Sequence, residues 1–444
     1  MKRTSIARAA LLLFGYLTGA LGADRYVIRT VPRPTQNIWS LAARYGGSFA
    51  KTLKDADSDK VYVVTLPQAA LAQMQRDRDV ESIEREQQVA LPLRKFHTNG
   101  FAGTSARVPR LPDVSRKSNF FGTYAWSPYL NQTAADIIRV DEARRYATGA
   151  GVVAVIDTGA DFTHPVLSPS LVMGWDFTRD TSGGSESADI NQEVTPILDQ
   201  EVTPILDEGG VVILNAERPV RLDQEVTPIL DQRIPAALGH GTMTAGIVHL
   251  VAPTARIMPL KAFRSDGTAT ISDVIEAIYW AVDHGADVIS MSFDAPVSSP
   301  ELTKAIRYAS SKKVVLVAAA GNDGQNVMVY PAGYDSVIGV GSTNDRDVRS
   351  QFSNFGDVVK LAAPGEAIVT TYPRRRYALG WGTSFSTPMV AGAAALLLQI
   401  DRSLTPKKAL EALSEAVRIS SRGMGEGRLD LVKACTAAGR QRWN

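Results

Sequence analysis

The chain has 444 residues, of which 45% are apolar and 21% charged, and its formal net charge is +2 at pH 7. This length allows two or three domains with a buried core. The near-neutral charge excludes a strongly basic nucleic-acid-binding protein, so we expect no nucleic-acid partner. The single cysteine, Cys435, excludes an intrachain disulfide, so packing must supply the stability.

Residues 1–22 have the pattern of a secretory signal peptide. Basic residues precede a short apolar run at 9–17, and small residues follow it. The run is too short to span a bilayer comfortably, which favours export over a single membrane anchor. We expect cleavage near residue 22, a secreted or extracytoplasmic protein, and no stable membrane span after cleavage.

Residues 24–90 alternate between strand and helix patterns in the order β-α-β-β-α-β. Strands are predicted at 26–31 and 61–66, helices at 37–44 and 69–76, and a closing strand pattern from Val80 to Val89. The pattern predicts a small α+β domain of about 65 residues, near the lower limit for a domain that folds alone.

Residues 91–130 differ in composition from both neighbours. Basic residues outnumber acids, Pro, Ser, Gly and Asn are frequent, and no hydrophobic period is visible. A basic nucleic-acid-binding arm is one interpretation, but an exposed linker open to proteolysis is favoured.

From residue 131 the pattern becomes α/β. Amphipathic helices are predicted at 271–284 and 300–311. Apolar runs typical of buried parallel strands lie at 152–156, 256–260, 288–291, 314–319 and 337–340. This alternation predicts a parallel sheet covered by helices.

An eight-residue repeat occupies residues 192–231. Gln-Glu-Val-Thr-Pro-Ile-Leu-Asp occurs intact at 192–199, 200–207 and 224–231, and two related octads lie between the last two copies. The Asn or Asp that ends each unit suits a turn, and the apolar positions suit short stacked strands. A duplicated surface loop is an equal alternative, because each intact unit contains a Pro. The array lacks the Gly-rich calcium-repeat pattern, so we do not expect it to bind Ca²⁺.

Two residues lie in settings that suit acid–base chemistry. Asp157 ends an apolar strand and precedes Thr158-Gly159; a carboxylate there can orient an imidazole, although a lone strand-ending Asp is usually a turn residue. His240 lies between glycines at the start of an apolar helix, where a neutral imidazole can accept a hydroxyl proton. The other histidines, His97, His164, His249 and His284, suit linker, structural or surface positions.

Ser384 follows Gly382-Thr383 and opens a helix rich in Ala and Leu. A serine hydroxyl becomes a strong nucleophile when a base removes its proton, and the N–H groups of a helix N-terminus can face a developing oxyanion. An N-cap is the ordinary role of such a serine. The chain order Asp, His, Ser favours a catalytic triad instead. Asn322 follows the apolar run 314–319 and can donate its amide to the oxyanion.

These motifs resemble those of the subtilisin-like serine peptidases (subtilases), over roughly residues 131–436. The resemblance implies an α/β fold: a subtilisin-like parallel sheet covered by helices on both faces, preceded by a small α+β ferredoxin-like propeptide domain. It assigns Asp157, His240 and Ser384 to the triad and Asn322 to the oxyanion hole. The implied order is signal peptide 1–22, inhibitory propeptide 24–90, linker with the maturation cleavage 91–130, and catalytic domain 131–444 with the repeat insertion 192–231.

The resemblance also implies which residues bind an extended polypeptide substrate. They are Gly267, Thr268 and Ala269 in one segment, Ser292, Phe293 and Asp294 in a second, and Ala320, Gly321 and Val329 around the primary pocket. Asp294 stands where relatives usually have Gly, and Val329 where many have a small residue. We therefore hypothesise a shallower pocket than in broad-specificity relatives, which a preference for large aromatic side chains would contradict.

We expect no cofactor for the chemistry. Residues 247–253 lack the Asn-rich insertion that binds calcium tightly in many relatives, so that site is not predicted, while structural calcium elsewhere stays open. The expected partners are a polypeptide substrate and the chain's own propeptide as intramolecular inhibitor, and the expected state is a monomer. The sequence thus favours a secreted serine endopeptidase. A catalytically idle scaffold that binds through the repeat, or a general esterase, is the alternative.

Overall fold

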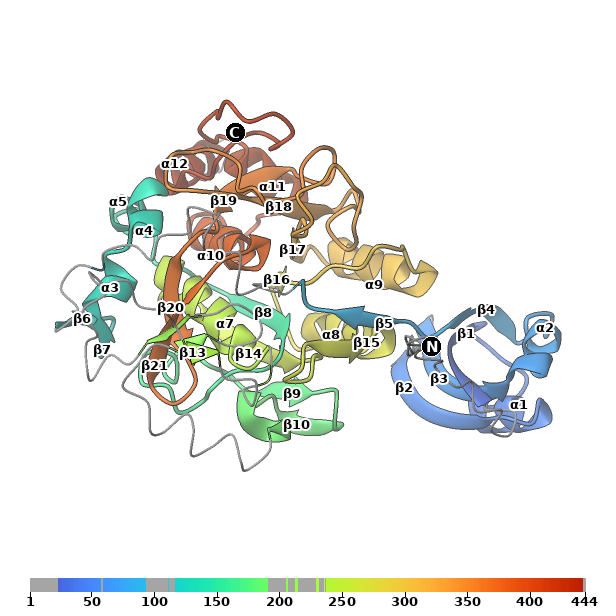
Figure 1. The fold of residues 1–444 in the computed structure, drawn as a ribbon. Helices are drawn as coiled ribbons and strands as arrows, with labels where there is room; N and C mark the ends of the chain where they lie inside the picture. The colour runs from blue at the N-terminus through green and yellow to red at the C-terminus, as the bar shows by residue number, and fades with distance from the viewer. Residues whose placement is uncertain are drawn as a thin grey trace, which may run out of the picture. The chain divides into compact units, whose positions relative to one another are not determined.

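A computed structural model of the chain describes residues 23–56, 59–92, 111, 116–190, 205–206, 212–214, 229–230, 235 and 237–441. The chain divides into two compact units, Met1–Arg85 and Glu86–Asn444 (Figure 1). The predicted signal peptide lies outside the described residues, as do residues 93–110 and 112–115 of the predicted linker and most of the repeat. The prediction of an exposed linker over 91–130 is wrong for residues 116–130. There β6 (Lys117–Phe120), β7 (Thr123–Trp126) and α3 (Ser127–Leu130) belong to the second unit, because the aromatic side chains of Phe120, Trp126 and Tyr129 pack into its core.

The first unit contains a four-stranded antiparallel sheet in the order β2-β3-β1-β4. Side chains from its strands, such as Ile28 and Val64, pack against Leu41 and Met74 from its two helices. Its elements are β1 (Ala23–Thr30), α1 (Ile38–Arg44), β2 (Ser48–Ala56), β3 (Asp59–Pro67), α2 (Leu71–Met74) and β4 (Val80–Arg85).

Two features of this unit differ from the sequence expectation. Helix α2 is shorter than the predicted helix 69–76, because a 3₁₀ turn at Gln68–Ala70 precedes it. The strand pattern that begins at Val80 is interrupted after Arg85, and its last part forms a separate strand, β5 (Gln88–Ala90), which belongs to the second unit.

The second unit is built on an eight-stranded sheet in the order β10-β9-β14-β8-β16-β17-β18-β19. All neighbouring pairs are parallel except β10 with β9. The strands are β8 (Val152–Asp157), β9 (Gly174–Asp176), β10 (Thr181–Gly183), β14 (Arg256–Lys261), β16 (Val288–Met291), β17 (Val315–Ala319), β18 (Val337–Thr343) and β19 (Leu361–Pro364). The five strands predicted from apolar runs are therefore present, and they are buried.

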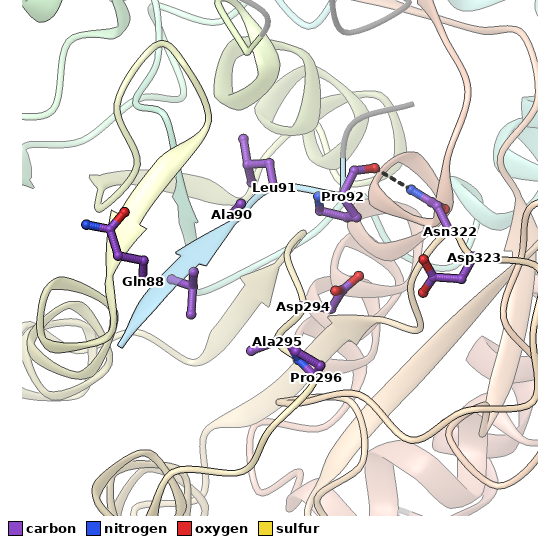
Figure 2. Close-up of a pocket in the computed structure, with 10 residues that line it drawn as sticks. Gln88, Ala90, Leu91, Pro92, Asp294, Ala295, Pro296, Asn322 and Asp323 are labelled. Carbon is purple, nitrogen blue, oxygen red and sulfur yellow. Dashed lines mark hydrogen bonds between the residues drawn. The ribbon is translucent and has the colours of Figure 1, made fainter. Parts of the chain in front are cut away.

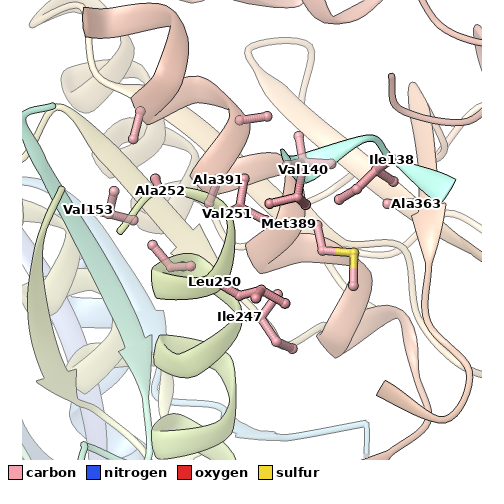
Figure 3. Packing of buried hydrophobic residues seen from close by; sticks show 14 of the residues in the cluster. Ile138, Val140, Val153, Ile247, Leu250, Val251, Ala252, Ala363, Met389 and Ala391 are labelled. Atoms are coloured by element: carbon pink, nitrogen blue, oxygen red, sulfur yellow. The ribbon is translucent and has the colours of Figure 1, made fainter. Parts of the chain in front are cut away.

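Helices cover this sheet in two groups (Figure 1). Helix α7 (His240–Val251) packs on α10 (Thr383–Ile400), while α8 (Ile271–Asp283) packs on α9 (Pro300–Ser311). Alternate strand residues such as Val153 face the first group, where Figure 3 shows them with side chains of α7 and α10. The remaining helices are α3 (Ser127–Leu130), α4 (Thr133–Ile137), α5 (Val140–Ala143), α11 (Pro406–Leu413) and α12 (Leu431–Gln441).

Helix α10 is long and apolar enough to cross a membrane by composition, and among the described residues no other helix meets that test. Its residues from Thr383 to Leu398 are nevertheless buried by the sheet and by neighbouring helices. Its apolar character on all sides is that of a core helix.

Parts of the octad repeat form short strands. Ile205–Leu206 (β11), Val212–Leu214 (β12) and Ile229–Leu230 (β13) occupy the apolar positions of three units. They extend the hairpin of β20 (Ile368–Tyr372) and β21 (Arg376–Gly380) in the order β13-β11-β12-β21-β20. The repeat positions expected to form strands do so where the structure describes them.

Candidate active site

Asp157 and His240 form the first part of the candidate site. Asp157 is the last residue of β8 and is fully buried, while His240 is the first residue of α7 and is 4% exposed. His240 Nδ1 lies 2.7 Å from Asp157 Oδ1. The carboxylate also accepts the Thr158 N–H at 2.8 Å and the Thr244 hydroxyl at 3.1 Å. These bonds fix the carboxylate and direct His240 Nε2 away from it.

A buried glutamate joins these two elements. Glu186, which is 1% exposed, lies in the 3₁₀ turn Glu186–Asp189. It accepts hydrogen bonds from the Thr158 hydroxyl, from Gly239 N at 3.1 Å, and from the Thr242 N–H at 2.8 Å and hydroxyl at 2.9 Å. One carboxylate therefore ties the residue after Asp157 to the N-terminus of the helix that starts at His240.

The charge state of Glu186 depends on opposing effects. Burial raises its pKa to about 7, and Asp157 adds to the rise. The nearby Lys261 ammonium and the hydrogen bonds from Thr158 and Thr242 oppose it. Four donors directed at one carboxylate suit its ionised form, because a protonated carboxyl would present a donor of its own. Sequence analysis missed Glu186, since nothing in the spacing of Ser185-Glu186-Ser187 marks it.

Ser384 lies at the N-terminus of α10 and is 3% exposed. Its hydroxyl donates to the carbonyl oxygen of Ser292 at 3.2 Å, and the Ser292 hydroxyl donates back to Ser384 O at 3.0 Å. The ring of Phe385 lies 5.8 Å from the His240 ring, centroid to centroid, which brings the starts of α10 and α7 together. A hydroxyl has one proton, so Ser384 must turn from Ser292 before it can donate to His240.

Asn322, which follows β17, is oriented by the start of α10. Its Oδ1 accepts from the Thr383 N–H and the Thr383 hydroxyl, both at 3.0 Å. Its Nδ2 therefore points the other way, where it donates to the carbonyl oxygen of Pro92 at 2.8 Å (Figure 2). An amide fixed in this manner presents a donor to a carbonyl close to Ser384, the arrangement required of an oxyanion hole.

The segment that carries Pro92 lies in a groove of the second unit as an extended strand. Strand β5 pairs antiparallel with β15 (Thr268–Thr270), and Leu91 N donates to Gly267 O at 2.9 Å. On its other edge, Ala90 forms an antiparallel bridge with Asp294. A piece of the chain thus adds a strand between the two segments predicted to bind substrate.

The same register places Pro92 opposite Ser292, two residues along each strand from Ala90 and Asp294. Proline has no N–H to donate to Ser292 O. That carbonyl instead accepts the Ser384 hydroxyl.

A pocket of about 600 Å³ lies beside this segment. Of the predicted site residues, Asp294 and Asn322 line it, together with Asp323 and all five residues of the segment 88–92 (Figure 2). The other residues predicted for the second segment and the primary pocket do not line it and are buried. They are Ser292, Phe293, Ala320, Gly321 and Val329.

The remaining described histidines have the structural or surface positions expected for them. His164 bonds to Arg376 O at 3.0 Å, and burial lowers its pKa to about 4. His249 bonds to Ser170 Oγ at 3.1 Å, and burial lowers its pKa to about 3. His284 is exposed and stacks on Trp280. Within the described ranges, no group of three or more His, Cys, Asp or Glu side chains is placed to bind a metal ion.

Comparison with known proteins identifies the family. The model of the Subtilase family matches residues 149–429. Thermitase of Thermoactinomyces vulgaris is 33% identical over 321 residues, which cover 69% of this chain and 97% of thermitase. The thermophilic serine proteinase of Bacillus sp. (strain AK1) is 33% identical over 285 residues, 64% of this chain and 61% of that protein. Subtilisin DY of Bacillus licheniformis is 40% identical over 189 residues, 40% of this chain and 69% of subtilisin DY.

The family match covers the strands and helices that position Asp157, His240, Asn322 and Ser384. The sequence-based resemblance is therefore confirmed, as is the α/β fold expected from it. The chain belongs to the subtilase family and is a subtilisin-like serine endopeptidase.

Proposed function

We propose that this peptidase uses Ser384, His240 and Asp157 as a catalytic triad and requires no cofactor. The observation that carries the proposal is the pairing of two contacts: His240 Nδ1 on Asp157 at 2.7 Å, and Asn322 Nδ2 on a peptide carbonyl at 2.8 Å. The first orients a base, and the second marks where a reacting carbonyl lies.

In the proposed reaction Ser384 Oγ attacks the scissile carbonyl carbon while its proton passes to His240 Nε2. Asp157 orients the imidazole and stabilises its charged form. The oxygen, now negative, is stabilised by Asn322 Nδ2 and the backbone N–H of Ser384. His240 then gives the proton to the leaving amine, and water releases the acyl group by the reverse sequence, which regenerates Ser384.

Polypeptide substrate would lie as an extended strand between β15 and the residues from Ser292 to Asp294. The course of β5 and Pro92 supports this, because it makes the backbone contacts that an added strand requires. We further propose that residues 24–92 act as an intramolecular inhibitor until they are cleaved off. Pro92 suits such a role, since it brings a carbonyl to Asn322 but has no N–H for Ser292.

The precursor would pass through three steps before it is active. The chain would be exported through the signal peptide 1–22, fold with the propeptide 24–90, and process itself within 91–130. The product would be a monomeric, secreted protein that begins within 91–130 and contains the catalytic domain, 131–444, with its repeat insertion.

Labelling of the processed protein with a fluorophosphonate tests the triad. We expect covalent modification of Ser384, mapped by mass spectrometry, and no labelling of Ser384→Ala. Ser386→Ala is the matched control, because Ser386 lies on the same helix but its hydroxyl donates to Ala363 O and Pro364 O. Absence of labelling in folded, processed wild-type protein would refute the triad and favour the idle scaffold.

A further inference from the structure

The pocket beside Pro92 is acidic. Asp294 and Asp323 both line it, and none of the described residues that line it is a Lys, Arg or His. Figure 2 shows the two carboxylates near Pro92, with Asn322 between Asp323 and the Pro92 carbonyl. Because Asn322 marks the reacting carbonyl, this wall faces the residue on the amino side of the cleaved bond, the P1 residue.

Asp294 is the less solvated of the two carboxylates. Its Oδ2 is buried and has no hydrogen-bond partner among the described residues. The side chain reaches across to Gly321, where an added Cβ would lie 3.0 Å from Oδ2. Burial, and secondly the charge of Asp323, raises the pKa of Asp294 to about 7. A buried carboxylate oxygen without a partner is costly, and a cation that entered the pocket would remove that cost.

Asp323, which follows Asn322 in the chain, supplies the second carboxylate of the pocket. It is exposed, and its Oδ2 accepts from Asn354 Nδ2 at 3.2 Å. A cationic side chain between Asp294 and Asp323 would face two carboxylates, and the head group of Lys or Arg can donate to both. Pro92, whose carbonyl Asn322 binds in the structure, lines the pocket but offers it no charge.

We propose that Asp294 and Asp323 form a P1 pocket for Lys or Arg, so that this peptidase cleaves after basic residues. The proposal rests on the proposed function, because the triad and Asn322 define which residue is P1. It also makes the hypothesis of a shallower pocket more specific. The Asp294 side chain narrows the space toward Gly321, and its carboxylate makes that space acidic.

The chain's own sequence offers a substrate for such a pocket. Arg94 follows Pro92 by two residues. A shift of two residues preserves the alternation of an extended strand, so Arg94 could take the place of Pro92 and supply the N–H that proline lacks. We therefore expect maturation after Arg94 rather than after Pro92.

Peptides that differ only at P1, with Arg, Lys, Gln, Met, Ala or Phe, test this pocket. With mature enzyme we expect kcat/KM to be about 30-fold or more higher for Arg and Lys than for Gln and Met. In Asp294→Asn the ratio of Arg to Met should fall about 30-fold, and in Asp323→Asn by less. Asp345→Asn, which removes an exposed carboxylate outside the pocket, should leave the ratio as in the wild type.

The outcomes separate this proposal from the proposed function. Enzyme that labels with a fluorophosphonate but cleaves equally well after Met, Ala or Phe would overturn the basic pocket and leave the triad standing. A preference for Arg that survives both Asp substitutions would overturn it as well. Protein that neither labels nor cleaves any peptide would overturn both proposals. Loss of folding is not expected for Asp294→Asn, since it removes an unpaired buried carboxylate.

Discussion

The Asp–His half of the site and the Ser–Asn half are fixed by different partners. Asp157 and His240 bond to each other, and Glu186 joins their two elements from inside the catalytic unit. The reactive groups of Ser384 and Asn322 instead donate to carbonyl oxygens along the groove, one of them on the bound segment. The base is thus preorganised by the protein's interior, whereas the alignment of the nucleophile depends on what occupies the groove.

The largest effect is expected from removing the base. His240→Ala should lower kcat by about 10⁶-fold, because Ser384 then has no group to take its proton. The measurement is hydrolysis of a peptide by variants whose propeptide has been cleaved by immobilised wild-type enzyme, which is then removed. His284→Ala is the control and should retain activity, because His284 is exposed and caps the C-terminus of α8. Similar losses of kcat in both variants would contradict the assignment of His240 as the base.

Loss of the oxyanion donor should be a smaller effect. Asn322→Ala should lower kcat by about 10²- to 10³-fold with little change in KM, since Nδ2 acts mainly on the charge formed in the transition state. Thr383→Val removes the hydroxyl that helps to fix the Asn322 amide but keeps the Thr383 N–H contact, so its loss should be less. A Thr383 effect that exceeds the Asn322 effect would contradict this assignment.

Substitution of Glu186 tests whether its buried carboxylate holds Asp157 and His240 in their relative positions. Glu186→Gln replaces one acceptor oxygen with an NH₂ group that faces donors, so His240 should be displaced and kcat reduced by about 10- to 100-fold. KM should change little, and Glu186→Asp should recover part of the rate. Glu411→Gln on the exposed face of α11 is the matched control. Equal losses of kcat and thermal stability in the Gln and Asp variants would indicate a purely structural role.

The smallest effect is a dependence of specificity on pH. The pKa of Asp294 is raised to about 7, so this carboxyl is mostly neutral below that pH and ionised above it. The ratio of kcat/KM for Arg over Met at P1 should therefore rise several-fold between pH 6 and 8. Protonation of the triad changes kcat/KM for both substrates by the same factor, so it does not change their ratio. In Asp294→Asn the ratio should be flat over this range, and a rise that persists there would exclude Asp294 as its source.

The sequence predicted the elements that carry long apolar runs, and with them the positions of Asp157, His240, Asn322 and Ser384. Asp157 ends a buried strand, Asn322 follows one, and His240 and Ser384 lie at the starts of buried helices, so the local pattern was sufficient. Glu186 could not be predicted, because its role comes from contacts with residues far along the chain. The placement of β5 in the second unit depends on pairing with β15, which sequence spacing does not specify.

The acidic pocket shows the same limit. Sequence resemblance marked Asp294 as a departure but suggested only a change in depth. That its Oδ2 lies buried without a partner, in a pocket that Asp323 also lines, depends on the three-dimensional arrangement.

The most direct test of the account is the N-terminal sequence of wild-type and Ser384→Ala protein, produced in a host that lacks other extracellular proteases. Wild-type protein should begin within 91–130, with Lys95 as the expected first residue. Ser384→Ala should keep residues 24–92 and lose them when a trace of active wild-type enzyme is added. Processing of Ser384→Ala at the same bond without added enzyme would contradict the claim that Ser384 cleaves its own chain.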